Sequence, residues 1–260
     1  MLATGSVEVS APNLPALRTV KLDYGFSEAA VNLNRKFDPA SPLLIVTLDI
    51  QWEEQDTYSS ISLLEETLMG FSPTFEKHEC RGEQIYHVFL GAGRPYPAPP
   101  EGSAAADDGS TAGLEPFDGR LALAHLIEHA IIDFQCAITH RRRCSGVTAA
   151  YRQLAGRFDV IVECANRRLG MVCLSLAVSW LTSALGGKTL GAAEKEVLTV
   201  ARLAHNRRGV LTPPAIARVL GWSEPRAQRA LSALRDAGYL DQASYTLNFS
   251  GIPEYQVSGD

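Results

Sequence analysis

The order of apolar and polar residues predicts strands in the first part of the chain and long helices in the middle. Residues 43–50 are β-branched and apolar and follow Pro42, which is typical of a strand. The same criteria predict further strands at residues 20–24, 84–90 and 158–164. Apolar residues at helical spacing predict a helix at residues 60–69.

Two long helices are predicted at residues 121–139 and 166–185. The first contains no Gly or Pro, and the second ends at Gly186-Gly187, where glycine tolerates a left-handed cap. The apolar run within the second helix is short for a membrane span and contains hydroxyl side chains, so we expect a buried core helix and no membrane segment. Residues 145–155 predict a turn and a short helix.

The last part of the chain has the pattern of a small helical domain. Helices are predicted at residues 192–206, 213–220 and 224–237, and residues 239–240 and 245–249 predict a hairpin. Thr212 and Ser223 are the expected N-caps, and Gly221 the expected turn between the second and third helices. Three helices followed by a β-wing form the winged-helix arrangement.

We therefore predict an α+β fold, in which an antiparallel sheet packs against two long helices, followed by a small winged-helix domain. The α+β domain spans residues 41–187 and the winged-helix domain residues 190–252, with Gly186-Gly187 as a hinge that lets the tail fold separately. Residues 1–40 stay unassigned apart from the short strand. Residues 91–119 are rich in Gly, Pro, Ala, Ser and Asp, which predicts a flexible insertion, either a lid or an inert linker.

Composition narrows the class of protein. The chain has 260 residues, 46% of them hydrophobic, and a net charge of -5, which argues against a nucleic-acid protein that relies on bulk charge. Its five cysteines are odd in number and lack C-x-x-C spacing, which favours reduced thiols. The first 15 residues do not have the pattern of a secretory signal, so we expect a cytoplasmic protein.

The segment His125-Leu126-Ile127-Glu128-His129 lies within the first long helix and reads H-x-x-E-H. Positions i, i+3 and i+4 share one helix face, so two imidazoles and a carboxylate lie together there. This is the inverted order of the zinc-peptidase motif, in which the histidines bind Zn²⁺ and the glutamate is the catalytic base. The alternative is a pair of hydrogen-bonded core histidines.

A catalytic zinc usually takes three protein ligands, so a third is required from another element. Glu163 is the best candidate, because it ends an apolar strand where a carboxylate needs explaining. The alternative for Glu163 is a strand-end residue facing solvent. Asp133, one turn beyond His129, is a candidate partner for a ligand imidazole or a surface residue of the helix.

Two groups of polar residues are candidates for binding. Arg141, Arg142, Arg143 and Arg152 follow the motif helix and can hold a substrate carboxylate, although a solvated helix end explains the first three as well. Arg226, Gln228 and Arg229 begin the third tail helix, where a winged helix reads DNA. Residues 194–240 hold eight Lys/Arg against four Asp/Glu, which suits phosphate contacts.

Four stretches give the region 43–185 a resemblance to the N-terminal domain of cyanophycin synthetase: residues 43–49, 75–80, 124–130 and 158–163. In that family the domain is similar to one half of an inverted-motif zinc peptidase. Some members use it to cut cyanophycin, a poly-aspartate with arginine side branches. The resemblance implies that His125, His129 and Glu163 bind zinc and that Glu128 is catalytic.

The chain also departs from that family. The ATP-dependent ligase domains and any G-x-x-x-x-G-K-[ST] loop are absent from the sequence, and the glycine- and arginine-rich turn is poorly kept at residues 144–152. We expect a zinc-dependent peptidase or amidase acting on a peptide-like substrate, such as cyanophycin-like or β-aspartyl-arginine material. The alternative is a winged-helix regulator or scaffold, with a DNA or protein partner and a sensing or inactive first domain. The sequence leaves the oligomeric state, including a homo-oligomer, open.

Overall fold

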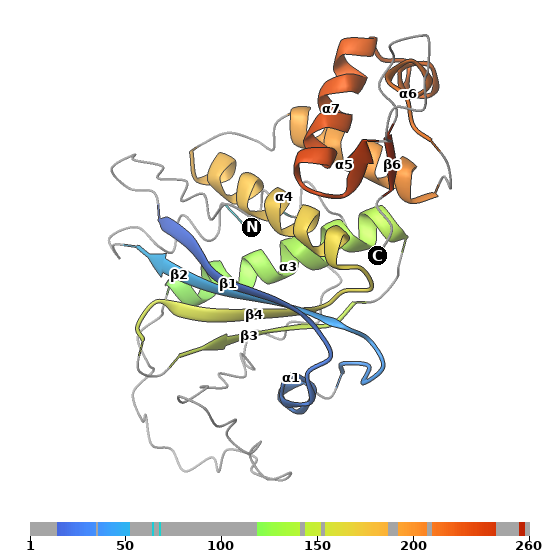
Figure 1. Ribbon diagram of the computed structural model, residues 1–260. Coiled ribbons are helices and arrows are strands. Elements are labelled where there is room, and N and C mark those ends of the chain that lie inside the picture. Colours follow the sequence, from blue (N-terminus) through green and yellow to red (C-terminus); the bar gives the residue numbers. More distant parts are fainter. Residues whose placement is uncertain are drawn as a thin grey trace, which may run out of the picture.

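The structure is a computed structural model that describes residues 15–34, 36–52, 64, 68, 119–140, 144–151, 154–186, 192–206, 210–242 and 255–257. Its centre is a four-stranded antiparallel sheet in the order β1-β2-β4-β3 (Figure 1). The strands are β1 (Ala16–Gly25), β2 (Leu43–Gln51), β3 (Gly146–Ala150) and β4 (Arg157–Glu163). The predicted mixed architecture with an antiparallel sheet is therefore confirmed.

The two faces of the sheet differ because side chains alternate along a strand. On one face, Leu44, Val46, Val160 and Val162 belong to the main hydrophobic core. On the other face, Leu43 and Ile161 pack with Ala30 and Phe37, in and just after α1 (Glu28–Leu33). A β4 side chain can therefore reach the main core only from an even-numbered position. Side chains at odd-numbered positions of β4 lie on the opposite face of the sheet.

Helix α3 (Gly119–Thr139) packs on the main-core face and contacts β2, β3 and β4. Helix α4 (Arg167–Leu185) packs against α3 on the same side of the sheet (Figure 1). Asn166 caps α4 by accepting a hydrogen bond from the Leu169 backbone N–H at 3.0 Å. At Gly170 an added Cβ would lie 2.8 Å from the Cys164 sulfur, so glycine lets α4 approach the sheet closely.

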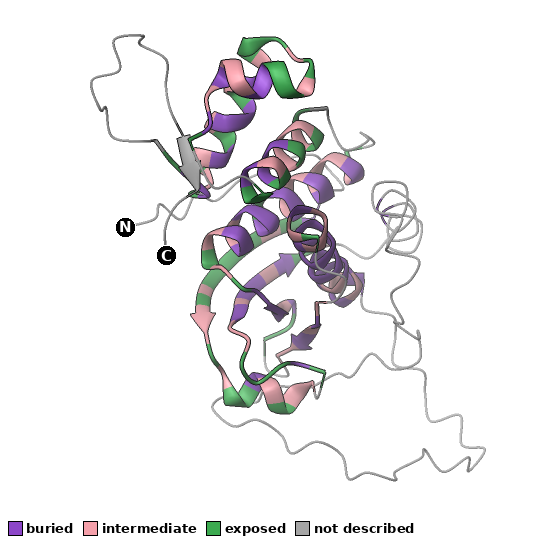
Figure 2. Cartoon of the chain, turned by 90° about the vertical axis from the view of Figure 1, so that its right-hand side faces the viewer, coloured by how far each residue is buried: buried purple, intermediate pink, exposed green. Residues whose placement is uncertain are grey.

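The tail contains α5 (Ala192–Asn206), α6 (Pro213–Leu220), α7 (Glu224–Asp236), β5 (Leu240–Gln242) and β6 (Tyr255–Val257). Helix α5 packs against both α3 and α7, so it belongs to the core of the sheet region and to the core of the tail. The buried side chains of Val200, Leu231 and Ile131 accordingly lie in one hydrophobic cluster. Figure 2 shows buried residues on the strands, on the helices above the sheet and on the tail helices. Helix α5 therefore joins the tail to the sheet region through one hydrophobic cluster.

Several local predictions hold at the level of single residues. Thr212 accepts a hydrogen bond from the Ala215 N–H at 3.3 Å and caps α6. Gly221 adopts the left-handed conformation, with φ of 67°, at the turn before α7. Leu231, Leu234 and Leu240 face inward as predicted.

Other local predictions are wrong. Residues 146–150 form strand β3 and not a short helix, because pairing with β4 overrides the local pattern. The partner of β5 is β6, whereas the predicted second strand of the hairpin, residues 245–249, lies outside the described residues. Gly186 ends α4 and Ser223 is the N-cap residue of α7, as predicted, but Gly186 has a φ of −76°, outside the left-handed region, and the Ser223 side chain makes no capping hydrogen bond.

Three predicted segments fall largely or wholly outside the described residues. The predicted strand at residues 84–90 and residues 91–118 of the predicted insertion lie outside the described residues. Gly119, predicted as the last residue of the insertion, is the first residue of α3. Within the predicted helix at residues 60–69, Leu64 and Leu68 are described, and both are helical and buried in the main core.

Two helices, α3 and α4, are long and apolar enough to cross a membrane by length and composition. In the folded chain, 78% of the apolar window of α3 and 56% of that of α4 are buried. Core helices of folded proteins meet the same criterion, so this finding does not favour a membrane span.

Candidate functional site: a histidine pair on helix α3

Helix α3 brings His125 and His129 together, as the i, i+4 spacing predicts. Their Nε2 atoms lie 3.0 Å apart. The two rings are perpendicular, with centroids 4.4 Å apart. His129 is buried, whereas 27% of the His125 side chain is exposed, so the pair lies at the edge of the core with one ring open to solvent.

The separation of the two Nε2 atoms is close to that between two zinc ligands. Zn–N distances of about 2.0–2.1 Å in a tetrahedral site separate two ligand nitrogens by about 3.3 Å. The Nε2 atoms need to move apart by only about 0.3 Å to reach that separation, which a small side-chain rotation supplies. The pair is equally able to form an imidazole–imidazole hydrogen bond when no metal is bound.

Glu128 lies beside the pair but faces a different nitrogen. Its Oε2 atom is 3.3 Å from Nδ1 of His125, on the far side of the ring from the Nε2 atom that faces His129. The same oxygen accepts a hydrogen bond of 2.6 Å from the Thr148 hydroxyl of β3. Glu128 is thus placed as a partner of a candidate ligand and of β3, not as a third ligand.

Strand β3 fits closely around this carboxylate. A Cβ added at Gly146 would lie 2.6 Å from Oε1 of Glu128 and 2.9 Å from Cδ1 of Ile132. Any other residue at position 146 would therefore push Glu128 or Ile132 aside. The absence of a side chain at Gly146 is what allows the Glu128 carboxylate to lie against the sheet.

The structure does not bring Glu163 to the histidine pair, as the predicted metal site requires. Glu163 lies two residues after Ile161 on β4, on the face of the sheet that packs against α1, whereas His125 and His129 belong to α3 on the opposite face. Its carboxylate accepts hydrogen bonds from the Asp38 N–H at 2.6 Å and the Ser145 N–H at 3.0 Å. Glu163 therefore joins the segment after α1 to the start of β3.

Within the described part of the chain, no group of three His, Cys, Asp or Glu side chains is placed to hold a metal ion. The described residues thus supply two adjacent imidazoles and no third ligand. Asp133 is buried in α3, so the surface alternative for it is wrong. That Asp133 supports the His129 imidazole when a metal is bound stays a prediction.

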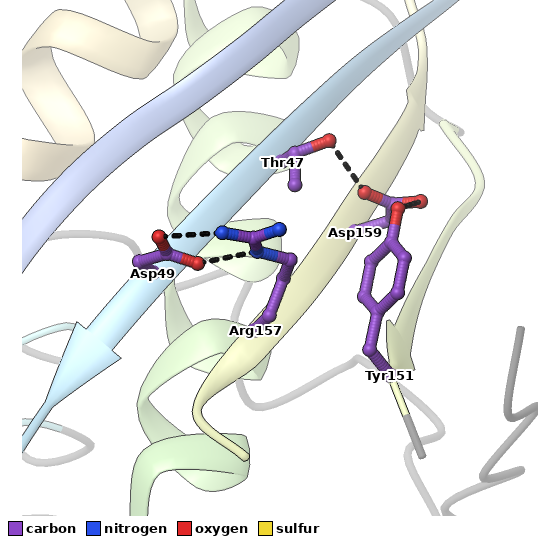
Figure 3. Close-up of polar contacts among 5 residues, drawn as sticks. All are labelled: Thr47, Asp49, Tyr151, Arg157 and Asp159. Carbon is purple, nitrogen blue, oxygen red and sulfur yellow. Dashed lines mark hydrogen bonds and ion pairs between the residues drawn. The ribbon is translucent and has the colours of Figure 1, made fainter. Parts of the chain in front are cut away.

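A second polar cluster lies on the other face of the sheet, with α3 behind it (Figure 3). The buried carboxylate of Asp159 accepts hydrogen bonds from the Thr47 hydroxyl at 2.7 Å and the Tyr151 hydroxyl at 2.9 Å. Beside it, Arg157 makes a two-bond ion pair with Asp49, at 2.6 and 2.9 Å.

These contacts change the ionisation of the cluster. Burial, reinforced by the hydrogen bond to Asp159, raises the pKa of Tyr151 to about 12. Hydrogen bonding to Arg157 lowers the pKa of the Asp49 carboxyl below its ordinary value. Every polar group of the cluster has a partner within the cluster, which is typical of a structural network.

The predicted binding residues divide into three cases. Arg141, Arg142, Arg143 and Arg152 lie outside the described residues. Arg226 is engaged within the tail, because it pairs with Glu196 of α5 at 2.8 Å and lies over the ring of Trp222 at 4.3 Å. Gln228 donates to Ser232 at 3.0 Å, and Arg229 is exposed on α7.

Sequence reasoning missed Thr148 and Gly146, because it assigned residues 145–155 to a turn and a helix. It also missed the cluster around Asp159. The available signal was the alternation of polar residues within otherwise apolar strands: Thr47 and Asp49 in β2, and Arg157 and Asp159 in β4.

Neither a comparison with protein-family models nor a search of curated proteins finds a match to this chain.

Proposed function

We propose that this chain is a zinc-dependent hydrolase of the peptidase or amidase type. The observation that carries the proposal is the His125–His129 pair, with Nε2 atoms 3.0 Å apart and one ring partly exposed. Two imidazoles so placed are close to the separation that zinc requires, and the exposed ring gives a substrate access.

In this proposal the residues of α3 have distinct roles. His125 and His129 hold the metal, which when bound supplies the Lewis acidity that polarises a scissile carbonyl and activates water. Glu128 accepts the proton of the attacking water and returns it to the leaving nitrogen. In this structure Oε2 contacts Thr148 and His125 and Oε1 lies against Gly146, so the Glu128 side chain must turn toward Nε2 of His125 to take this proton.

The proposed substrate is peptide-like. The resemblance to the N-terminal domain of cyanophycin synthetase favours cyanophycin-like or β-aspartyl-arginine material, and the free carboxylates of such a substrate suit the arginines at positions 141–143 and 152. This assignment depends on the resemblance, whereas the assignment of the metal depends on the histidine geometry.

Metal analysis of the purified chain tests the proposal. We expect about one zinc per chain in the wild type, and its loss in His125→Ala and His129→Ala. His205→Ala is the matched control, because His205 is an exposed histidine on α5, and it should keep its zinc. A wild-type protein that takes up no zinc at micromolar concentrations would rule the proposal out.

Glu128→Gln tests the role of the carboxylate. The variant should keep zinc, because the amide oxygen can still accept from His125, but hydrolysis should slow by about 10²–10⁴-fold. A β-aspartyl-arginine dipeptide is the first substrate to try. Loss of zinc as complete as in His129→Ala would show that Glu128 is a ligand and not the base.

A second candidate function is DNA binding by the tail. We propose that α5, α6, α7, β5 and β6 form a winged helix, with α7 as the recognition helix. The observation that favours it is the first turn of α7, where Glu224 and Pro225 are exposed, together with the exposed Arg229. Arg226 is not assigned to DNA, because Glu196 and Trp222 already engage it.

Arg229→Ala tests this second function. If α7 reads DNA, the variant should weaken binding to a DNA duplex in a fluorescence anisotropy assay, and wild-type affinity should fall steeply with salt. Arg235→Ala is the control, because Arg235 lies in the last turn of α7 and contacts Asp236. Binding that is insensitive to salt and to Arg229→Ala would leave the tail as a protein-docking module.

A further inference from the structure

We propose that Thr148 is a positioning residue that fixes the tautomer of His125 through Glu128. In the chain Thr148–Glu128–His125, the carboxylate holds a proton on Nδ1 of His125 and leaves Nε2 as a lone-pair donor. The consequence for zinc affinity rests on the proposed function, whereas the tautomer itself is a property of the metal-free protein.

The first step is the contact between Thr148 and Glu128. The hydroxyl oxygen of Thr148 lies 2.6 Å from Oε2 of Glu128, which is short and typical of a hydrogen bond to a carboxylate. Only 5% of Thr148 and 4% of Glu128 is exposed. Because water is largely excluded, the loss of this donor is not readily replaced by solvent.

The second step is the fit of the carboxylate against β3. Oε1 of Glu128 occupies the space that a Cβ at position 146 would take, and the backbone there is held by a 2.8 Å hydrogen bond from the Asn34 side chain to the Gly146 carbonyl. Glu128 is therefore held on two sides, by the hydroxyl of Thr148 and by the backbone of β3.

The third step concerns which groups donate. Oε2 of Glu128 accepts a hydrogen bond from the Thr148 hydroxyl and lies 3.3 Å from Nδ1 of His125. Because a carboxylate only accepts, this contact favours a proton on Nδ1 of His125. A neutral His125 with its proton on Nδ1 has a lone pair on Nε2. In the metal-free protein His129 then donates from Nε2 across the 3.0 Å contact, so the two histidines hold opposite tautomers.

This assignment gives Thr148 a role in metal binding at a distance. A carboxylate that holds the outer nitrogen of a ligand imidazole fixes its orientation and raises its basicity. Thr148 acts on that carboxylate, so it prepares Nε2 of His125 for the metal without contacting the metal or a substrate.

The test compares wild type, Thr148→Val and Thr148→Ser in metal-free protein. Long-range ¹H–¹⁵N correlation spectra, recorded above the ordinary histidine pKa, report the tautomer of each ring. We expect Nδ1–H for His125 and Nε2–H for His129 in the wild type and in Thr148→Ser, and mixed tautomers for His125 in Thr148→Val. Competition with a chelator should show zinc affinity about tenfold lower in Thr148→Val and little changed in Thr148→Ser.

The outcomes separate this inference from the proposed function. An Nε2–H tautomer or an imidazolium for wild-type His125, or an unchanged His125 spectrum in Thr148→Val, would overturn the inference whether or not zinc binds. The expected tautomers in a wild type that takes up no zinc would support the inference and reject the zinc hydrolase. Circular dichroism of each variant checks that the fold is kept, and valine suits strand β3 well.

Discussion

Glu163 illustrates how one residue can match a catalytic pattern and serve the fold. Its carboxylate accepts hydrogen bonds from the backbone N–H groups of Asp38 and Ser145, and both bonds are lost if it is removed. We expect Glu163→Ala to lower the free energy of unfolding by about 2–4 kcal/mol, and Glu163→Gln by about half as much, because glutamine keeps one acceptor oxygen.

Urea denaturation followed by circular dichroism measures these differences. The zinc content of the folded Glu163→Ala protein should equal that of the wild type. If both variants instead lost zinc without losing stability, Glu163 would be a metal ligand after all.

Tyr151 should make stability depend on alkaline pH. Its folded pKa of about 12 exceeds the ordinary value of 10.0, so the folded protein keeps a proton that the unfolded chain loses. The corresponding stabilisation is present below about pH 10 and is lost as the pH rises towards about 12.

Tyr151→Phe isolates this contribution. The variant should be less stable than the wild type by about 1–2 kcal/mol near neutrality, because Asp159 loses a hydrogen bond. The difference should narrow between about pH 10 and about pH 12 in denaturant titrations. Burial also raises the pKa of Tyr239 to about 12. Tyr239 is present in both proteins, so its contribution cancels in the difference between them. A constant difference over this range would contradict the assignment.

At the scale of elements, the turn into β4 depends on Gly156. Its φ is +80°, and an added Cβ would lie 2.5 Å from the Ile50 carbonyl oxygen at the end of β2. Gly221 has a similar φ of +67°, but no atom lies within 4 Å of its added Cβ. The two glycines therefore differ in surrounding space and not in backbone conformation.

We expect Gly221→Ala to lower the free energy of unfolding by about 1–2 kcal/mol, from backbone strain alone. Gly156→Ala should lower it by about 1–2 kcal/mol more, because the turn into β4 must also move away from β2. Thermal unfolding of the two variants measures the comparison. Equal losses would show that the turn relaxes without disturbing β2.

At the scale of the whole molecule, α5 should make the sheet region and the tail unfold together. It packs against α3 and α7, and an ion pair of 3.2 Å between Arg168 of α4 and Asp241 of β5 joins the same two regions. Truncation of the fully buried Val200 on α5 should lower the free energy of unfolding of both regions by about 2 kcal/mol.

Hydrogen exchange in urea can follow α3 and α7 separately in Val200→Ala. Amides of both helices should lose protection at the same denaturant concentration, because the core between them is continuous. Loss of protection in α7 while α3 stays protected would show that the tail is an independent unit.

The sequence by itself determined the features that depend on local spacing. Repeated apolar residues defined α3, α4 and α5, Thr212 and Gly221 marked the limits of α6, and the i, i+4 spacing placed His125 beside His129. These properties follow from helix geometry and backbone preference, which a short segment carries with it.

Only the tertiary structure decided which distant segments meet. Residues 146–150 became a strand because β4 offered hydrogen-bond partners, and this strand brought Thr148 and Gly146 to Glu128. Glu163 was separated from the histidines by the alternation of side chains across a sheet, whose register depends on pairing between β2 and β4. Arg226 turned inward because Glu196, on another helix, lay within reach. Strand pairing, and the face of the sheet on which a side chain lies, depend on contacts between distant segments, so the composition of each segment could not reveal them.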